Sequence, residues 1–276
     1  MSTNPQSLIQ SEVVLVTEES PGYLNVRFSN PPMSLMDNRV FAGLRLLRDL
    51  VEQRKSNLMV FESDDPDFFI AHLDFPKVQD VPDVPGAQSI VDGWPEFSVW
   101  LTNCPCVSIA KVRGRTRGIG NEFICACDMR FASLEFAKFA QLEMGYSLIP
   151  GGGGIEWLPQ HVGRSRALEI ICSAQDFDAT TAELYGWINR ALPDAELDHY
   201  VDILSRRIAS FDGTALATAK RLVNSRCIPV TEEQLAESFA AINELGKRQE
   251  SKDRYARMGR INGTTRKAQL ITPELF

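Results

Sequence analysis

Residues 106–132 read CVSIAKVRGRTRGIGNEFICACDMRFA. The first seven are rich in apolar and β-branched side chains, which predicts a buried strand. A glycine-bearing turn from Gly118 to Gly120 then opens a helix that ends near Asp128, and residues 129–132 form a second apolar strand. The predicted order is strand, glycine turn, helix, strand. Such units bind ligands where the N–H groups at the start of a helix point outward.

Two glutamates in and beyond this unit, Glu122 and Glu143, lie beside segments that contain glycine. A pair of carboxyl groups can divide the roles of general base and general acid, and bare backbone N–H groups beside them can stabilise an oxyanion. Local sequence also allows simpler interpretations. Glu122 can cap its helix, where the macrodipole stabilises a carboxylate by about 0.3–1 kcal/mol, and Glu143 can form a salt bridge in a loop.

The chain before this unit predicts alternating strands and helices. Residues 13–17 and 23–29 are β-rich runs around a Ser-Pro-Gly turn, which predicts a hairpin. Val40, Leu44, Leu47 and Val51 follow at helical spacing, with Asp37 or Asn38 as the N-cap, and residues 58–62 form a short apolar strand. Residues 79–95 are rich in Pro, Asp and Gly, and are either a mobile flap or an ordinary connection.

The chain after Gly154 is mainly helical, with helices predicted at residues 165–172, 179–185, 197–208 and 214–223. Thr231 and Gln234 have the spacing of a capping box, which starts another helix whose apolar face carries Leu235, Phe239 and Ile242. We therefore expect an α/β core over residues 1–195 and a helical region over residues 196–276.

Composition excludes several classes of protein. The net charge of −7 disfavours a nucleic-acid partner, because binding to phosphate backbones requires a basic surface. No segment has the ~20 apolar residues needed to span a bilayer, and the N-terminus lacks a secretory pattern, so we expect no membrane partner and a cytoplasmic location. The six cysteines have no zinc-site spacing and are expected to be reduced, with no metal bound.

Three familiar catalytic or nucleotide motifs do not fit. In the turn at Gly118, the third glycine of a dinucleotide fingerprint would fall at Phe123, and no Lys-Ser or Lys-Thr follows the glycines at 151–154. The histidines are His72, His161 and His199, and none adjoins a nucleophile elbow. His161 and His199 are expected on helix surfaces, whereas His72 adjoins the segment at Leu73 discussed below.

Taken together, several ordered segments resemble the crotonase superfamily, also called the enoyl-CoA hydratase/isomerase superfamily. The resemblance runs from residue 30 to about residue 193. The motifs that carry it are Ile109 to Gly114, Gly118 to Glu122, Cys127 to Ala132, Phe139 to Glu143, Ile149 to Gly154 and Leu158 to Gly163.

The resemblance implies a repeated ββα core, a C-terminal helical region used in trimerisation, and an acyl-CoA substrate. It places Glu122 and Glu143 at the two carboxylate positions of the hydratases. It also places Leu73 and Ile119 where that family has the two backbone N–H groups of its oxyanion hole. The expected assembly is a homotrimer or hexamer. The resemblance also implies a role in fatty acid metabolism.

The resemblance also implies a binding site for coenzyme A, which arrives as part of the substrate thioester; no separate cofactor is expected. The backbone of Ala71 matches a position that holds the adenine. His72, Asp74 and Lys77 are placed beside the coenzyme. His72 and Ile119 stand where the family usually has glycine.

The implied reaction is the reversible syn hydration of a trans-2-enoyl-CoA. Negative charge develops on the thioester oxygen while water adds to Cβ and a proton to Cα, so Glu122 is assigned as the base and Glu143 as the acid. One alternative is a double-bond isomerase or another enolate-forming enzyme on the same scaffold. Another is a non-catalytic oligomeric binding protein that lost thioester handling through His72, Ile119 and Pro76.

Three arginines, Arg113, Arg115 and Arg117, alternate on the approach to Gly118. If this segment is extended, their side chains share one face. We expect at least one of them to meet an acidic group, either on the acyl substrate or on a neighbouring subunit.

Overall fold

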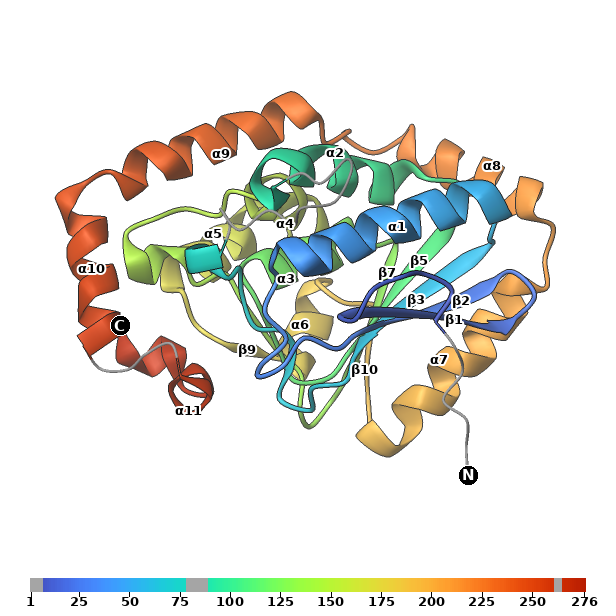
Figure 1. The fold of residues 1–276 in the computed structure, drawn as a ribbon, viewed down its shortest axis with the longest axis horizontal. Coiled ribbons are helices and arrows are strands. Elements are labelled where there is room, and N and C mark those ends of the chain that lie inside the picture. The colour runs from blue at the N-terminus through green and yellow to red at the C-terminus, as the bar shows by residue number, and fades with distance from the viewer. Residues whose placement is uncertain (1–6, 78–88, 261–264) are drawn as a thin grey trace.

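The computed structural model describes residues 7–77, 89–260 and 265–276 (Figure 1). It opens with antiparallel strands β1 (Val14–Ser20) and β2 (Tyr23–Phe28), which confirm the predicted hairpin. Helix α1 (Asn38–Arg54) follows, and its N-cap is Asp37, whose side chain accepts hydrogen bonds from the backbone N–H groups of Arg39 and Val40. The apolar residues at helical spacing are buried, as predicted.

Replacing Asp37 with Ala is expected to lower the free energy of unfolding by about 1 kcal/mol, because the first N–H groups of α1 then lose their acceptor. Urea unfolding at equal protein concentration measures the change. Asp49→Ala on the exposed side of the same helix is the matched control and is expected to leave the midpoint unchanged. Equal midpoints for both variants would contradict the role given to the cap.

The core repeats a strand–strand–helix unit three times after the opening hairpin and α1. The repeats are β3 (Leu58–Ser63), β4 (Phe68–Ile70) and α2 (Ile90–Asn103); β5 (Val107–Val112), β6 (Arg115–Arg117) and α3 (Ile119–Ala126); and β7 (Met129–Ser133), β8 (Lys138–Ala140) and α4 (Gly154–Val162). Two short 3-10 helices, η1 (Phe75–Lys77) and η2 (Glu143–Tyr146), follow β4 and β8.

The two strands of each repeat belong to different sheets. The first strands enter a six-stranded sheet of order β1-β2-β3-β5-β7-β10, which ends at β10 (Arg190–Leu192). The second strands form a four-stranded sheet of order β4-β6-β8-β9, with β9 (Phe177–Asp178) antiparallel to β8. Because β4, β6 and β8 are parallel neighbours, their carboxyl ends meet at one edge.

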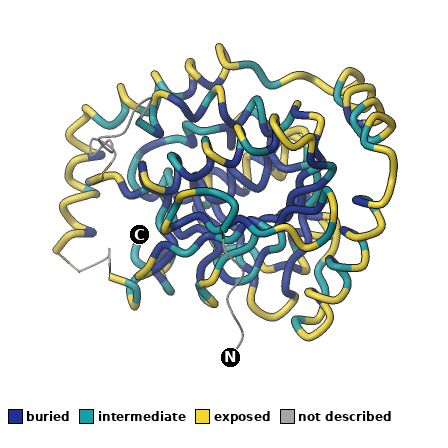
Figure 2. The backbone as a smooth tube through the Cα atoms, turned by 45° about the vertical axis from the view of Figure 1, so that its right-hand side comes forward, coloured by how far each residue is buried: buried dark blue, intermediate teal, exposed yellow. Residues whose placement is uncertain are grey.

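The six-stranded sheet is covered on both faces, and alternate residues of one strand show this. Met59 and Phe61 of β3 join the main core with α1, α2 and α3, whereas Leu58 and Val60 pack against α7 (Asp194–Ala209). Figure 2 shows the buried residues concentrated in the sheet and in the helix faces turned toward it. This arrangement explains why the first four residues of β3 are all apolar and buried.

The predicted C-terminal helices are confirmed. They are α5 (Arg164–Ser173), α6 (Ala179–Tyr185), α7, α8 (Gly213–Asn224) and α9 (Glu232–Gly246), and the capping box of Thr231 and Gln234 is present. Beyond α9 lie α10 (Gln249–Arg260), α11 (Arg266–Gln269) and η3 (Thr272–Leu275). In Figure 1, α9 and α10 run along one side of the core. The division at residue 195 stays a prediction.

Two sequence predictions are corrected. Of residues 79–95, those up to 88 lie outside the described residues, but Ser89 caps α2 and Pro95 lies within that helix instead of in a connection. A proline removes one hydrogen bond, which the burial of Trp94 and Phe97 on the same helix offsets. The second correction concerns His161, which is expected on a helix surface. It is partly buried, and its Nε2 lies 3.0 Å from the carbonyl oxygen of Cys125.

All six cysteines are free, and four of them are buried. In residues 7–77, 89–260 and 265–276, no group of three or more His, Cys, Asp or Glu side chains could hold a metal ion. None of the helices described is long and apolar enough to cross a membrane.

Candidate active site

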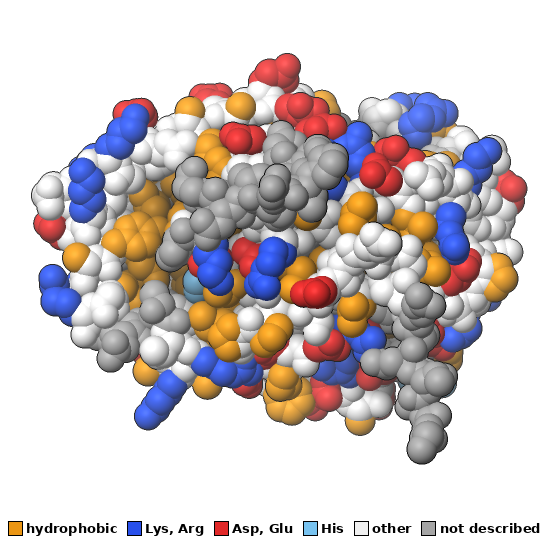
Figure 3. Space-filling view, viewed as in Figure 1, with side chains coloured by type: hydrophobic (Ala, Val, Ile, Leu, Met, Phe, Trp, Pro, Cys, Tyr) orange, Lys and Arg blue, Asp and Glu red, His pale blue; other side chains and the backbone are white. Residues whose placement is uncertain are grey.

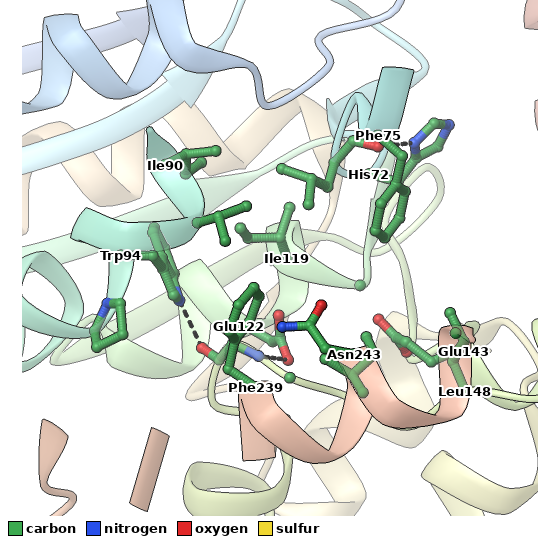
Figure 4. A pocket seen from close by; sticks show the side chains of 18 of the residues that line it. His72, Phe75, Ile90, Trp94, Ile119, Glu122, Glu143, Leu148, Phe239 and Asn243 are labelled. Carbon is green, nitrogen blue, oxygen red and sulfur yellow. Dashed lines mark hydrogen bonds between the residues drawn. The ribbon is translucent and has the colours of Figure 1, made fainter. Parts of the chain in front are cut away.

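Three neighbouring strand ends meet at one cavity. The chain leaves β4 toward Leu73, leaves β6 toward Ile119 and leaves β8 toward Glu143. The cavity there measures about 780 Å³. Figure 3 shows hydrophobic side chains gathered in a hollow beside α10, and Figure 4 shows the lining at close range. The lining residues are His72, Leu73, Phe75, Ile90, Val91, Trp94, Pro95, Gly118, Ile119, Glu122, Glu143, Leu148, Gly151, Gly152, Phe239, Ile242, Asn243, Gly246, Lys247 and Tyr255.

The backbone at Leu73 and Ile119 leaves two N–H groups for a ligand. Leu73 forms a parallel bridge with Met36, in which the N–H of Met36 donates to the carbonyl of His72 and the N–H of Asp74 donates to Met36. This pattern directs the N–H of Leu73 away from Met36. Ile119 is the first residue of α3, so its N–H has no carbonyl within the helix to bind.

Glycine is required at 118, immediately before this helix. Gly118 has a φ of +51°, and a Cβ there would lie 2.8 Å from Oε1 of Glu143. The left-handed conformation therefore falls on Gly118 and not on the β-branched Ile119, which begins the helix. An isoleucine is thus compatible with the backbone geometry at this position.

Glu122 is only 3 % exposed and is held by two backbone amides. Its Oε1 accepts hydrogen bonds from the N–H groups of Gly152, at 2.8 Å, and Gly154, at 3.1 Å. A Cβ at 152 would lie 2.5 Å from Oε2 of Glu122, so glycine permits this approach. Burial raises the pKa of Glu122 to about 7, although the two amides favour the carboxylate.

Glu143 lies on η2 and directs its carboxyl group into the same cavity (Figure 4). Burial, and then the charge of Glu122, raises the pKa of Glu143 to about 8. The Nε2 of Gln141 lies 3.4 Å from Oε2 of Glu143, and the Nδ2 of Asn121 donates to Gln141 at 2.8 Å. Because two backbone amides donate to Glu122 and Glu143 has only the long contact from Gln141, the site favours an ionised Glu122 beside a protonated Glu143.

Of the four residues predicted to bind coenzyme A, one lines the cavity and three do not. His72 lines the cavity, and its Nδ1 lies 2.8 Å from the carbonyl oxygen of Leu73. Its Nε2 is buried and has no hydrogen-bond partner among the residues that the structure describes, and burial lowers its pKa. Ala71 is fully buried and donates its N–H to Ser34. Asp74 is buried and pairs with the exposed Lys77 at 3.0 Å. Ala71, Asp74 and Lys77 lie outside the lining, and their contacts with coenzyme A stay predictions.

Much of the cavity wall was not found from sequence. Trp94 of α2 donates from its Nε1 to the carbonyl of Gly152 at 2.7 Å, which joins α2 to the segment that holds Glu122. Phe239 and Ile242 were predicted to share an apolar helix face, and the structure places that face over the cavity. Asn243 extends into the cavity from the same helix (Figure 4). Helical spacing identifies such a face, but it does not indicate what the face contacts.

Two of the three arginines meet acidic groups within the chain, and a contact of this segment with a substrate or a neighbouring subunit stays a prediction. Arg113 pairs with Asp194 at 2.7 Å and with Asp198 at 2.8 Å, both on α7. Arg117 is fully buried, and its Nε donates to Asp176 at 2.8 Å. These carboxylates belong to the chain itself and not to a substrate or a neighbouring subunit.

Comparisons with known proteins identify the family and the fold of this chain. Residues 18–265 match the family model described as enoyl-CoA hydratase/isomerase. A crystal structure of a Streptomyces avermitilis protein, assigned as a candidate enoyl-CoA hydratase, is 37% identical, covers 94% of each chain and has a TM-score of 0.86. The predicted crotonase-like α/β fold is therefore confirmed.

Two curated relatives with the names of specific hydratases match part of the chain. The short-chain-enoyl-CoA hydratase of Clostridium acetobutylicum is 31% identical over 52% of this chain and 55% of its own length. The mitochondrial methylglutaconyl-CoA hydratase of Mus musculus is 35% identical over 45% of this chain and 40% of its own length. The chain thus spans about half the length of these relatives.

Proposed function

Because the chain belongs to the enoyl-CoA hydratase/isomerase family, we propose that it catalyses the reversible syn addition of water to a trans-2-enoyl-CoA. The main support is one arrangement: the buried Glu122 and the half-buried Glu143 line a single cavity with Leu73 and Ile119. The names of the curated relatives support an acyl-CoA substrate. A homotrimer or hexamer remains the proposed assembly.

In the proposed reaction, the thioester oxygen accepts hydrogen bonds from the N–H groups of Leu73 and Ile119. The carboxylate of Glu122 removes a proton from water while the water oxygen bonds to Cβ, and the electrons of the double bond move onto the thioester as an enolate. Glu143 then donates its proton to Cα. Removing one oxyanion donor costs about 3–4 kcal/mol of barrier in comparable sites, so the two amides are a large part of catalysis.

The hydrogen bonds that two backbone amides donate to Glu122 favour hydration over double-bond isomerisation. Isomerisation moves one proton between carbons and needs one acid/base group, whereas hydration needs a second group to activate water. The amides of Gly152 and Gly154 support an ionised Glu122 for that second role. Coenzyme A is proposed to contact Ala71, His72, Asp74 and Lys77.

Incubation of the purified protein with trans-2-enoyl-CoAs of several chain lengths tests the proposal. We expect the absorbance of the conjugated thioester to fall and the product to be heavier by one water molecule. A product of unchanged mass with a shifted double bond would indicate an isomerase instead. Absence of both turnover and acyl-CoA binding would favour a non-catalytic binding protein.

The two glutamates also determine the expected pH dependence. Catalysis needs Glu122 ionised, so kcat/KM should fall as the pH drops below about 7. It needs Glu143 protonated, so kcat/KM should also fall as the pH rises above about 8. Initial rates measured from pH 5.5 to 9.5 should therefore give a narrow bell-shaped profile. A rate that stays constant over this range would be incompatible with these assignments.

A further inference from the structure

A row of aromatic side chains lies behind the turn that carries Glu143. The ring of Phe276 meets Tyr146 edge to face, with centroids 5.1 Å apart, and Tyr146 stacks on Tyr255 at 4.8 Å. Tyr255 of α10 in turn meets the ring of Phe75 at 6.0 Å. We call these four residues the aromatic row. It joins η2, which carries Glu143, to η1, which follows the oxyanion residue Leu73.

Phe276 also packs directly against Gly145 of the same turn. Gly145 is buried within η2, and a Cβ built there would lie 2.3 Å from the Phe276 ring. The ring therefore occupies the space that any other residue at 145 would need. Phe276 is not among the residues that line the cavity, so any effect on the reaction is indirect, through the residues on which its ring packs.

The segment that ends in Phe276 is anchored by two arginines. Arg117 is fully buried and donates from its Nη1 to the carbonyl of Gln269 on α11. Arg266 donates from its Nη2 to Asp65 at 2.8 Å. The Cζ atom of its guanidinium also lies over the ring of Phe68, 5.2 Å from the ring centroid. These anchors fix α11 against the core and so determine where Phe276 lies.

The turn also contacts α5 and α10, and its Met144 packs against the main core. The hydroxyl of Ser251 donates to the carbonyl of Ser147 at 3.1 Å, and Arg254 donates to the carbonyl of Gly145 at 3.4 Å. Both come from α10. Inside the turn, the N–H of Leu148 donates to the carbonyl of Glu143 at 2.9 Å. The ring of Phe276 adds apolar packing to this turn at Gly145 and Tyr146.

We propose that Phe276 is a positioning residue: its ring packs on Gly145, holds the η2 turn in place and excludes water from the carboxyl group of Glu143. This inference rests on the proposed hydration, in which Glu143 is the acid. Two consequences follow from losing the ring. The carboxyl group becomes less well placed over Cα, and it becomes better hydrated, which favours its ionised form.

Phe276→Ala is expected to lower kcat about 10- to 100-fold with little change in KM. The high-pH limb of the profile should also move to lower pH, because a hydrated Glu143 ionises more readily. Phe276→Leu, which retains apolar bulk, should recover much of both. Ile271→Ala, an exposed position in the same segment, is the matched control and should match the wild type. Wild-type kcat and pH profile in Phe276→Ala would overturn the inference.

A double-mutant cycle approaches the same contact from the other side. Gly145→Ala should displace the ring and lower kcat as Phe276→Ala does. In the double variant the ring is absent and the new methyl group has room, so the two losses should not add. Additive losses would show that Gly145 and Phe276 act independently and would overturn the inference.

Hydrogen exchange of the amides of residues 145–148 gives a readout that does not depend on turnover. Faster exchange in Phe276→Ala, but not in Ile271→Ala, is expected if the ring holds the turn. Unchanged exchange would overturn the inference even if the wild-type protein hydrates enoyl-CoA. If Phe276→Ala exchanges faster but the wild-type protein hydrates no enoyl-CoA, the packing role is supported while the proposed function fails.

Discussion

Glu143→Gln is expected to lower kcat/KM for the hydration of a trans-2-enoyl-CoA by about 10²- to 10⁴-fold, which is the usual contribution of a positioned acid. The amide has the shape of the protonated carboxyl group but cannot give a proton to Cα. KM should change little, because the substrate contacts other than this group remain. Steady-state rates from the loss of thioester absorbance measure the effect.

Glu122→Gln should cause a loss of similar size, since the amide cannot accept the proton of water. Glu52→Gln, at an exposed carboxyl group on α1, is the control and should match the wild type. If Glu143→Gln kept more than about a tenth of the activity, Glu143 would not be the acid.

The lost activity should not come from unfolding. Burial raises the folded-state pKa of Glu143 above its unfolded value, so the stability it contributes is complete below the unfolded pKa and is lost as the pH rises through about 8. Glutamine cannot ionise. At pH 9 the variant should therefore unfold at a temperature no lower than the wild type does.

Arg117→Met is expected to lower the free energy of unfolding by about 2–4 kcal/mol, somewhat less than for a fully buried pair because Asp176 is partly exposed. The variant leaves Asp176 without its close partner and removes the donor to the carbonyl of Gln269. Urea unfolding at equal protein concentration measures the loss.

Arg115→Met is the matched control for this variant. Arg115 lies on the same strand, but its Nε is 3.9 Å from Asp176, so a loss below about 1 kcal/mol is expected. Equal effects of the two substitutions would contradict the special role of the buried arginine. A double variant, Arg117→Met with Asp176→Leu, should recover part of the stability because the charge of Asp176 is removed together with its close partner.

Local chemistry explains which parts of the fold were predictable. The spacing of Val40, Leu44 and Leu47 identified α1 and narrowed its N-cap to residue 37 or 38, because both signals lie within a few residues. The helix around Pro95 was missed because a proline and its acidic neighbours are typical of a loop, whereas the burial that stabilises α2 comes from distant segments.

The same distinction holds for the candidate site. Glu122, Glu143, Leu73 and Ile119 were identified by motif, and the structure brings all four to one cavity because β4, β6 and β8 are adjacent. The partners of Arg117 and the contact of Phe276 with Gly145 join segments far apart in the chain. No local pattern encodes such pairings, so they emerge only from the fold.

A crystal structure of the protein with a saturated acyl-CoA tests the central claim most directly. The account predicts that the thioester oxygen lies about 2.7–3.1 Å from the backbone nitrogens of both Leu73 and Ile119. It also predicts an ordered water between Glu122 and Glu143, beside Cβ of the acyl group. A thioester bound away from these two nitrogens, or an acyl group that does not pass between the glutamates, would contradict it.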